Sequence, residues 1–242
     1  MLVGAALVVI GAGGFLVYAQ PQPLLAEATA ALSSDPEVAV STVGRDLVFR
    51  PTKATPTVGL ILYPGGKVPS TAYAPAAHRI AAMTGVLVTI VDVPFNLAVL
   101  DIDAASRVAG REAAIRVWAV GGHSLGGAMA AQYAASHPAT IRGLVLWASY
   151  SAADLSPADL SVLSIYGSLD TAAPTIRSAA NLARLPDDTM YVEISGANHE
   201  QMGWYTGQPN DPPAAIARTE QQNQVVIATS RFLAELGAAP GG

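Results

Sequence analysis

Eight short segments of the chain carry the hydrophobic patterns of β-strands. The first two alternate apolar and polar residues, as strands with one exposed face do. Most of the later ones are continuous apolar runs, which are typical of strands buried on both faces of a parallel sheet. The predicted strands are Val38–Val43, Asp46–Pro51, Val58–Tyr63, Val86–Val91, Arg116–Val120, Gly143–Trp147, Leu160–Tyr166 and Met190–Ile194.

Helical patterns separate the later strands. The predicted helices are Tyr73–Met83, Ile102–Ala114, a segment from Leu125 to about His137, Pro174–Ala183 and Gln222–Leu236. Strands that alternate with helices form a mostly parallel sheet with helices on both faces. The sequence therefore predicts an α/β protein with a sheet of roughly eight strands.

The N-terminal residues have a different pattern. Leu2–Tyr18 is an apolar run without charge, and the first basic residue is Arg45. The length of the run lies between that of a signal-peptide core and that of a membrane span, and a flank without positive charge is the kind that crosses a membrane. We predict a signal peptide or membrane anchor over residues 1–19, a linker over 20–37 and one domain over 38–242.

This pattern predicts an extracytoplasmic protein, secreted or attached to a membrane through residues 2–18. The alternative is a buried N-terminal helix, or a start codon assigned too far upstream. Gln20–Pro23 breaks the apolar run, and the Ala-rich stretch Leu24–Asp35 has the composition of a short helix.

Composition narrows the classes of function. The chain has 242 residues, 13% of them charged, with a net charge of −5 and scattered basic residues, so nothing suggests a nucleic-acid partner. It has no cysteine, which excludes disulfides, a thiolate nucleophile and cysteine-ligated metals. We expect no metal and no organic cofactor, and no sequence pattern indicates the oligomeric state.

The pentapeptide Gly122–Gly126 has the form G-x-S-x-G and lies between a predicted strand and a predicted helix. This arrangement is typical of a nucleophile elbow, a turn so sharp that the positions two before and two after the serine must lack a Cβ. It would present the hydroxyl of Ser124 at the positive end of a helix. The alternative is a Gly-rich turn with an ordinary surface serine.

A serine nucleophile needs a base, and the base needs an orienting acid. Of the four histidines, only His199 follows the last predicted strand in a loop, whereas the others belong to helices or to the elbow itself: His78, His123 and His137. Asp170 follows an apolar strand and a glycine turn, which favours it as the acid. The alternatives are an exposed loop histidine and a helix-capping aspartate.

A tetrahedral intermediate needs two backbone N–H groups that point at its oxyanion. We predict one from Leu125 and the other from Gly65 or Gly66, with a slight preference for Gly65. Lys67 next to them is expected to be a solvated lysine at the rim. The alternative is a lysine that biases the site toward anionic substrates.

Only Ala148–Asp159 separates two successive strands after the elbow, so the chain has no room there for a helical cap domain. We expect an open site, unless the long Pro-rich segment Gln201–Gln221 covers it. That segment contains Trp204 and Tyr205, which we predict to contact substrate.

Four segments together resemble the α/β-hydrolase superfamily, and most of all its small, capless bacterial branch related to dienelactone-hydrolase-like enzymes. They are Gly59–Val68, Gly121–Ala128, Tyr166–Asp170 and Gly196–His199. The resemblance covers about residues 38–238 and implies an α/β-hydrolase fold with a Ser124–Asp170–His199 triad. Two features depart from the pattern. Ser124 stands where dienelactone hydrolases have cysteine, so their substrate is not transferred, and Tyr63–Pro64 replaces the usual His-Gly before the oxyanion loop.

These observations predict a serine hydrolase that cleaves small carboxylic esters through an acyl-enzyme. The alternatives are a catalytically silent hydrolase fold that binds a ligand or partner at the cell envelope, and an acyltransferase, peptidase or cofactor-free perhydrolase with the same triad.

Overall fold

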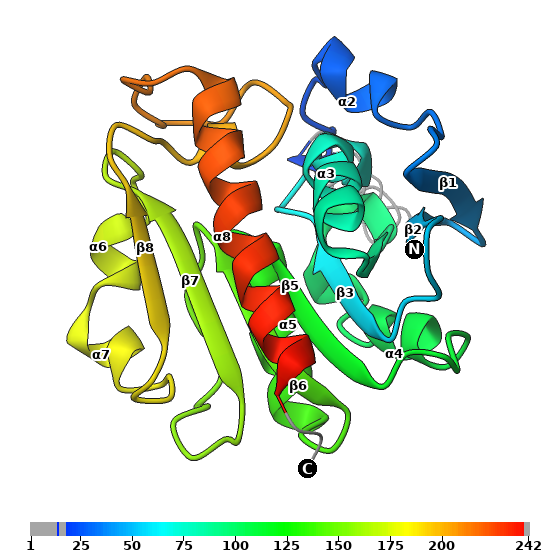
Figure 1. Cartoon of the computed structure of the whole chain (residues 1–242). Helices are drawn as coiled ribbons and strands as arrows, with labels where there is room; N and C mark the ends of the chain where they lie inside the picture. The colour runs from blue at the N-terminus through cyan, green and yellow to red at the C-terminus, as the bar shows by residue number, and fades with distance from the viewer. Residues whose placement is uncertain (1–13, 15–17, 240–242) are drawn as a thin grey trace, which may run out of the picture.

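All eight predicted strands are present and form one sheet in a computed structural model, which describes residue 14 and residues 18–239 (Figure 1). The strands are β1 (Val38–Val43), β2 (Asp46–Pro51), β3 (Val58–Tyr63), β4 (Leu87–Ile90), β5 (Val117–His123), β6 (Ile141–Trp147), β7 (Ser161–Gly167) and β8 (Met190–Ile194). Their order across the sheet is β1-β2-β4-β3-β5-β6-β7-β8.

The pairing directions follow the sequence patterns. The alternating strands β1 and β2 pair antiparallel with each other, and β2 pairs antiparallel with β4. Every other pair is parallel. Because parallel strands end at the same edge of a sheet, the loops after β3 to β8 meet there.

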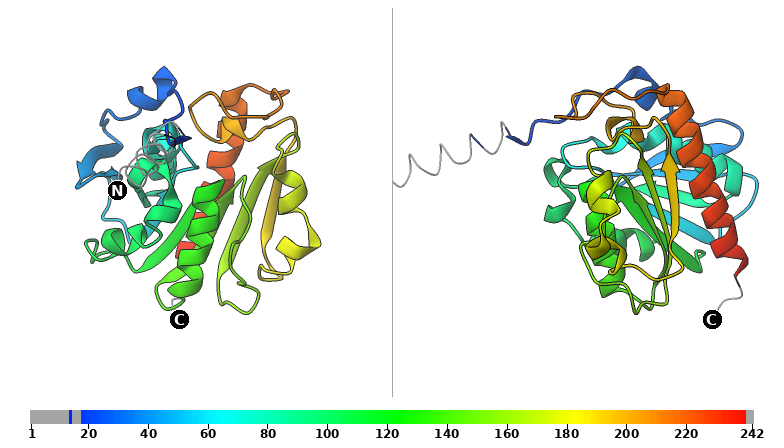
Figure 2. Two further views of the ribbon diagram at one scale, coloured as in Figure 1. Left: turned by 180° about the vertical axis from the view of Figure 1, so that it is seen from behind. Right: turned by 90° about the vertical axis from the view of Figure 1, so that its left-hand side faces the viewer.

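Helices cover both faces of the sheet (Figures 1 and 2). On one face α3 (Ala74–Thr84) and α8 (Arg218–Ala238) pack against buried strand residues such as Leu60 and Val145. On the other face α4 (Ala104–Ala109) and α5 (Leu125–Ser136) pack against residues such as Ile61 and Leu144. The predicted α/β architecture is therefore confirmed.

Three helices differ from their predicted bounds. The helix predicted over 102–114 is shorter, since α4 ends before Gly110. The helix predicted over 174–183 is two short helices, α6 (Ala173–Ile176) and α7 (Ala179–Leu182). They are separate because Ser178 is extended and caps α7 by accepting a hydrogen bond from the Asn181 N–H. The C-terminal helix α8 begins earlier and ends later than predicted.

No cap domain interrupts the fold. β6 ends at Trp147 and β7 begins at Ser161, so the connection between them is as short as the sequence indicated. In the described chain, loops and the segment that precedes β1 cover the carboxyl edge of the sheet.

The residues predicted as a linker, 20–37, pack against the domain. They include the short helix α2 (Ala26–Ala30), in which Ala28 is fully buried. His78 of α3 contacts the Ala31 carbonyl and the Asp35 carboxylate. This segment is therefore part of the folded body rather than a free tether.

The predicted signal peptide or membrane anchor lies almost wholly outside the described residues. Within the described part of the chain, no helix has both the length and the apolar character that crossing a membrane requires.

Candidate active site

Ser124 occupies the sharp turn between β5 and α5. Its backbone has φ 52° and ψ −122°, a conformation that residues other than glycine rarely adopt. A Cβ at Gly122 would lie 2.6 Å from the Tyr63 carbonyl oxygen, and a Cβ at Gly126 would overlap the same oxygen. Both glycines of the pentapeptide are therefore sterically required, as the elbow interpretation predicts.

The elbow is fixed from the adjacent strand. The Ser124 N–H donates to the Trp147 carbonyl at 3.0 Å, and Ser149 Oγ donates to the Ser124 carbonyl at 2.6 Å. Ser149 is buried. The sequence does not single it out, because nothing in its local pattern distinguishes it from other loop serines.

Asp170 and His199 are brought together from loops after β7 and β8. Nδ1 of His199 lies 2.9 Å from Asp170 Oδ1, and both residues are buried. The same carboxylate oxygen accepts the Ala172 N–H at 2.7 Å in a local turn, but the N-cap of α6 is Ala172 and no side chain caps that helix, so Asp170 is not the helix cap considered as an alternative. The structure thus joins two of the three predicted triad residues directly.

The backbone of the His199 loop is held by a second carboxylate. The N–H groups of His199 and Glu200 donate to Asp211 at 3.1 and 2.8 Å. Asp211 lies in the long loop before α8, and its role depends on a contact that no local pattern encodes.

The elbow contacts this pair through His123, the residue before Ser124. The rings of His123 and His199 are 4.5 Å apart between centroids, which places the His199 imidazole beside the turn that carries Ser124. Within residues 18–239 no hydrogen bond joins Ser124 Oγ to the His199 ring in this structure. Such hydrogen bonds are often long without substrate and shorten in the reacting complex.

The two candidate oxyanion donors of the β3 loop (residues 64–68) differ in their contacts. The Gly65 N–H donates to Tyr73 Oη at 2.9 Å. No acceptor in the described chain takes the Gly66 N–H, and a Cβ on Gly66 would lie 3.4 Å from Cδ2 of Leu125. Leu125 is the first residue of α5, where a helix leaves its N–H groups unpaired. This geometry favours Gly66, in contrast to the slight sequence preference for Gly65.

Tyr73 and His123 form a buried pair behind the β3 loop. Tyr73 Oη lies 2.9 Å from His123 Nδ1. Burial lowers the pKa of His123 well below its usual value, and the neighbouring His199 lowers it further. Burial raises the pKa of Tyr73. Both side chains therefore remain neutral near pH 7.

The predicted substrate contacts of Trp204 and Tyr205 are not supported by the positions of these residues. Tyr205 is fully buried, with its hydroxyl 3.2 Å from Gln208 Oε1 and its ring 6.2 Å from that of His123. Trp204 lines a small cavity of about 90 Å³ with residues of α3 and α8. Tyr205 is therefore a buried packing neighbour of His123.

The chain before α2 crosses between two loops of the site. In this N-terminal strap (residues 20–25), the Gln22 N–H donates to the Lys67 carbonyl at 2.9 Å. Two further hydrogen bonds join the strap to the 204–206 loop. The Leu25 N–H donates to the Trp204 carbonyl at 3.1 Å, and the Thr206 N–H donates to the Pro23 carbonyl at 2.9 Å. The strap therefore connects the β3 loop with the loop that follows His199.

Backbone strain in the described chain gathers at this edge of the sheet. Six non-glycine residues have positive φ angles: Lys67, Phe95, Asn96, Ser124, Ala148 and Asn210. Each lies in a loop that contributes to the site or is hydrogen-bonded to one, and the Lys67 N–H donates to the Asn96 carbonyl at 2.8 Å. Strained backbone persists where the surrounding structure holds it, and it gathers at functional sites.

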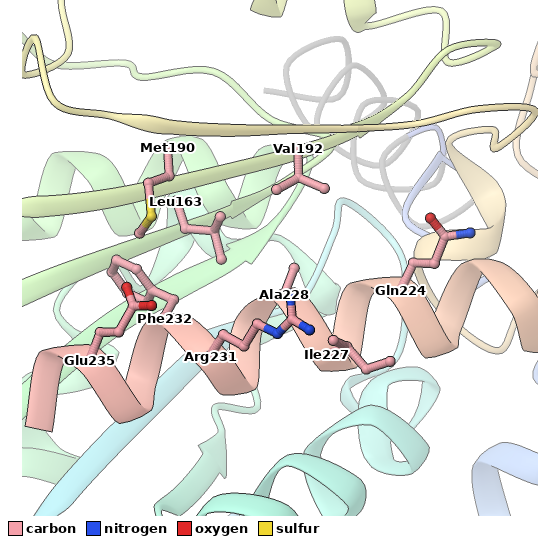
Figure 3. Close-up of a pocket in the computed structure, with 9 residues that line it drawn as sticks. All are labelled: Leu163, Met190, Val192, Gln224, Ile227, Ala228, Arg231, Phe232 and Glu235. Atoms are coloured by element: carbon pink, nitrogen blue, oxygen red, sulfur yellow. The ribbon is translucent and has the colours of Figure 1, made fainter.

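A separate apolar cavity of about 330 Å³ lies between β8 and α8 (Figure 3). Leu163 and Val192 line it from the sheet, and Ile227 and Phe232 from the helix. None of the predicted site residues takes part in it. In the described chain no group of three His, Asp or Glu side chains is arranged to hold a metal ion.

Comparison with known proteins agrees with this architecture. The family model described as "Alpha/beta hydrolase family" matches residues 59–223. No protein with a curated description matches the sequence.

Solved structures with similar folds include an esterase from Pyrobaculum calidifontis, at a TM-score of 0.64 and 18% identity over 87% of this chain and 89% of that one. The ester-hydrolase EH1AB1 from the metagenome of Lake Arreo superimposes with a TM-score of 0.63 and 18% identity, covering 88% and 87% of the two chains. A hydrolase described as CIB-like from Thermoplasma acidophilum has a TM-score of 0.59 at 16% identity, over 82% and 99%. At these identities the similarity shows the fold.

Proposed function

Because the chain belongs to the alpha/beta hydrolase family, we propose that it is a serine hydrolase that cleaves carboxylic esters of small molecules through an acyl-enzyme. The observation that carries the proposal is the buried contact between His199 and Asp170, beside the turn that presents Ser124. The esterases among the structural neighbours support the choice of ester substrates.

In the first step, Ser124 Oγ attacks the ester carbonyl carbon while Nε2 of His199 takes the hydroxyl proton. Asp170 stabilises the resulting imidazolium through Nδ1. When the tetrahedral intermediate collapses, His199 gives the proton to the leaving alkoxide, and an alcohol departs. Water then attacks the acyl-enzyme with His199 as base, and the carboxylic acid leaves as Ser124 regains its proton.

The negative charge of each tetrahedral intermediate is received by backbone N–H groups of Leu125 and Gly66. Donors already directed at the oxyanion need no reorganisation during the reaction, and removal of one such donor costs about 10²–10³-fold in kcat. The N-terminal end of α5 adds a favourable dipole at the same place.

The experiment is labelling with a fluorophosphonate, followed by mapping of the modified serine and a panel of esters. We expect labelling at Ser124 alone and loss of both labelling and turnover in Ser124→Ala. Ser136→Ala, an exposed serine on the same helix, is the matched control and should behave as wild type. Esterase activity that survives in Ser124→Ala would refute the proposal.

The same panel separates the alternatives. Acyl transfer to an added alcohol in preference to water would identify an acyltransferase. Folded wild-type protein that neither labels nor turns over any ester would favour a silent binding protein.

We also propose an extracytoplasmic location, on the basis of the uncharged apolar run Leu2–Tyr18 and the acidic residues that follow it. N-terminal sequencing of the mature protein tests this. A chain that begins at Gln20 indicates a cleaved signal, and a complete chain in the membrane fraction indicates an anchor. Complete protein in the cytosol would refute the proposal.

A further inference from the structure

The β3 loop rests on two buried aromatic side chains that the mechanism above does not use. The Gly65 N–H donates to Tyr73 Oη, and Tyr73 Oη lies 2.9 Å from His123 Nδ1. A Cβ at Gly65 would approach His123 Nδ1 to 2.7 Å and Tyr73 Oη to 2.9 Å. The loop therefore lies directly on the two polar atoms, with no space for a side chain between them.

The direction of these hydrogen bonds follows from what each group can donate. Gly65 can only donate through its N–H, so Tyr73 Oη accepts there. His123 Nδ1 is the only acceptor within reach of the Tyr73 hydroxyl proton among the described residues, so a Tyr73 donor leaves no proton unpaired. Nδ1 of His123 is then the acceptor, and the ring carries its proton on Nε2. The Gly65 N–H, Tyr73 Oη and His123 Nδ1 thereby form one chain of hydrogen bonds, whereas the buried Nε2 has no partner among the described atoms.

Both residues also touch the rest of the site. His123 precedes Ser124, and its ring lies against that of His199. The Tyr73 ring packs 5.9 Å from that of His123 and 6.4 Å from that of Trp147, at the end of β6. The pair thus connects the β3 loop, the elbow and the base through one rigid contact.

We propose that Tyr73 and His123 are positioning residues, which hold Gly65 so that the next N–H in the loop, that of Gly66, points at the oxyanion beside Leu125. The inference rests on the proposed function. With Gly65 anchored through its own N–H, Gly66 is the nearest residue whose N–H remains free, and its orientation follows from the anchored peptide.

Tyr73→Phe tests the role by removing one hydroxyl. We expect kcat for a neutral ester to fall about 10- to 100-fold, as small displacements of catalytic groups do, with KM within about twofold. The affinity for a boronic acid that mimics the tetrahedral intermediate should fall by the same factor. The matched control is Tyr133→Phe, which removes a buried hydroxyl bonded to Ser106 on the opposite face of the sheet. This control should lose stability but keep its kcat.

Substitution of His123 separates positioning from packing. His123→Asn keeps an oxygen near the place of Nδ1 that can accept the Tyr73 proton, whereas His123→Leu does not. We expect His123→Asn to retain most of the inhibitor affinity and His123→Leu to lose as much as Tyr73→Phe. The double variant Tyr73→Phe/His123→Leu should be no worse than either single variant, because both break one hydrogen-bonded unit.

Equal kcat and inhibitor affinity in Tyr73→Phe and wild type would overturn the inference, as would equal inhibitor affinities in the two His123 variants. A second test, a nitrogen-detected NMR spectrum, uses wild-type protein alone and so does not depend on whether the variants fold. A proton on Nε2 of His123 supports the hydrogen-bond direction, and a proton on Nδ1 overturns it. Activity retained in Ser124→Ala would instead contradict the proposed function itself.

Discussion

His199 Nδ1 and Asp170 Oδ1 lie 2.9 Å apart, and both side chains are almost fully shielded from solvent. This contact fixes the orientation of the imidazole ring. It leaves Nε2 as the ring nitrogen that can serve Ser124, since Nδ1 is engaged. The pair is the least exposed part of the proposed triad, because Ser124 itself is half-buried.

Asp170→Asn should lower kcat about 10³- to 10⁴-fold, because an amide no longer stabilises the imidazolium or fixes the productive tautomer. Steady-state hydrolysis of a short-chain ester measures this. Asp159→Asn is the matched control, since that carboxylate is 99% exposed and pairs only with Arg142 among its described neighbours. If the two variants have similar kcat values, Asp170 is not the catalytic acid.

The strained backbone at Ser124 predicts an unusual order of stabilities. Both Ser124→Ala and Ser124→Gly remove the hydroxyl, but only glycine removes the Cβ that opposes φ 52°. We expect Ser124→Gly to be more stable than Ser124→Ala by about 1 kcal/mol, the lower end of the cost of such strain. Urea denaturation compares the two free energies of unfolding, and an alanine variant as stable as the glycine variant would argue against strain here.

His123 predicts a loss of stability in mild acid. Burial and the adjacent His199 keep its pKa well below 6.5, so the unfolded chain takes up a proton that the folded chain does not. The groups that face its ring are Tyr73, His199 and Tyr205. The free energy of unfolding is therefore unaffected by this group above the unfolded pKa of about 6.5. Below that pH it falls by about 1.4 kcal/mol per pH unit.

Urea denaturation at pH 7.5 and pH 5.5 measures this effect. Wild type should lose about 1.4 kcal/mol more than His123→Asn between these values, because about one pH unit of the window lies below the unfolded pKa. Parallel losses in the two proteins would show that another group carries the acid sensitivity.

From the lowered pKa of Asp46 we expect a second loss of stability at more acidic pH. Burial alone would raise the pKa of its carboxyl, but hydrogen bonds from Arg107, the Asp92 N–H and Arg111 outweigh burial and lower the pKa. Its contribution to stability is therefore present above the unfolded pKa of about 3.9 and is lost as pH falls through the lower folded value.

Asp46→Asn should cost about 3 kcal/mol at pH 7, because two partly buried arginines lose their anion. The deficit relative to wild type should shrink below pH 4. Thermal unfolding from pH 7 to pH 3 follows both effects, with the exposed Asp188→Asn as control. A deficit that stays constant with pH would contradict the ionic role.

The N-terminal strap predicts a sharp limit for truncation. A chain that starts at Gln20 keeps all three backbone hydrogen bonds to the site loops, whereas one that starts at Ala26 loses them. At about 0.5–1.5 kcal/mol for each hydrogen bond, we expect a loss of roughly 2–4 kcal/mol in the shorter chain and a lower kcat. Equal melting temperatures and activities for the two chains would show that the strap is dispensable.

Much of the fold could be predicted because it depends on local patterns. Every strand was found from apolar periodicity, and the elbow from two glycines that its turn requires sterically. The break between α6 and α7 was missed because a serine cap competes with helix continuation over a few residues, where propensity decides little.

The parts of the site that were missed depend on contacts between distant segments. The choice between Gly65 and Gly66 turns on a tyrosine hydroxyl that reaches the loop from the turn before α3. Tyr205 was expected at the substrate, yet the short bridge between Leu24 and Tyr205 and the packing of its ring bury it. No single-sequence pattern records which of two neighbouring aromatics faces inward.

The strap also has a consequence for biosynthesis. Its residues are translated long before their partners Trp204 and Thr206. Until then the strap lacks two of its three backbone hydrogen bonds to the site loops, since only its bond to Lys67 can form earlier. The loop that follows His199 can therefore complete its contacts with the strap only late in synthesis, after the sheet strands β1 to β8 have been made.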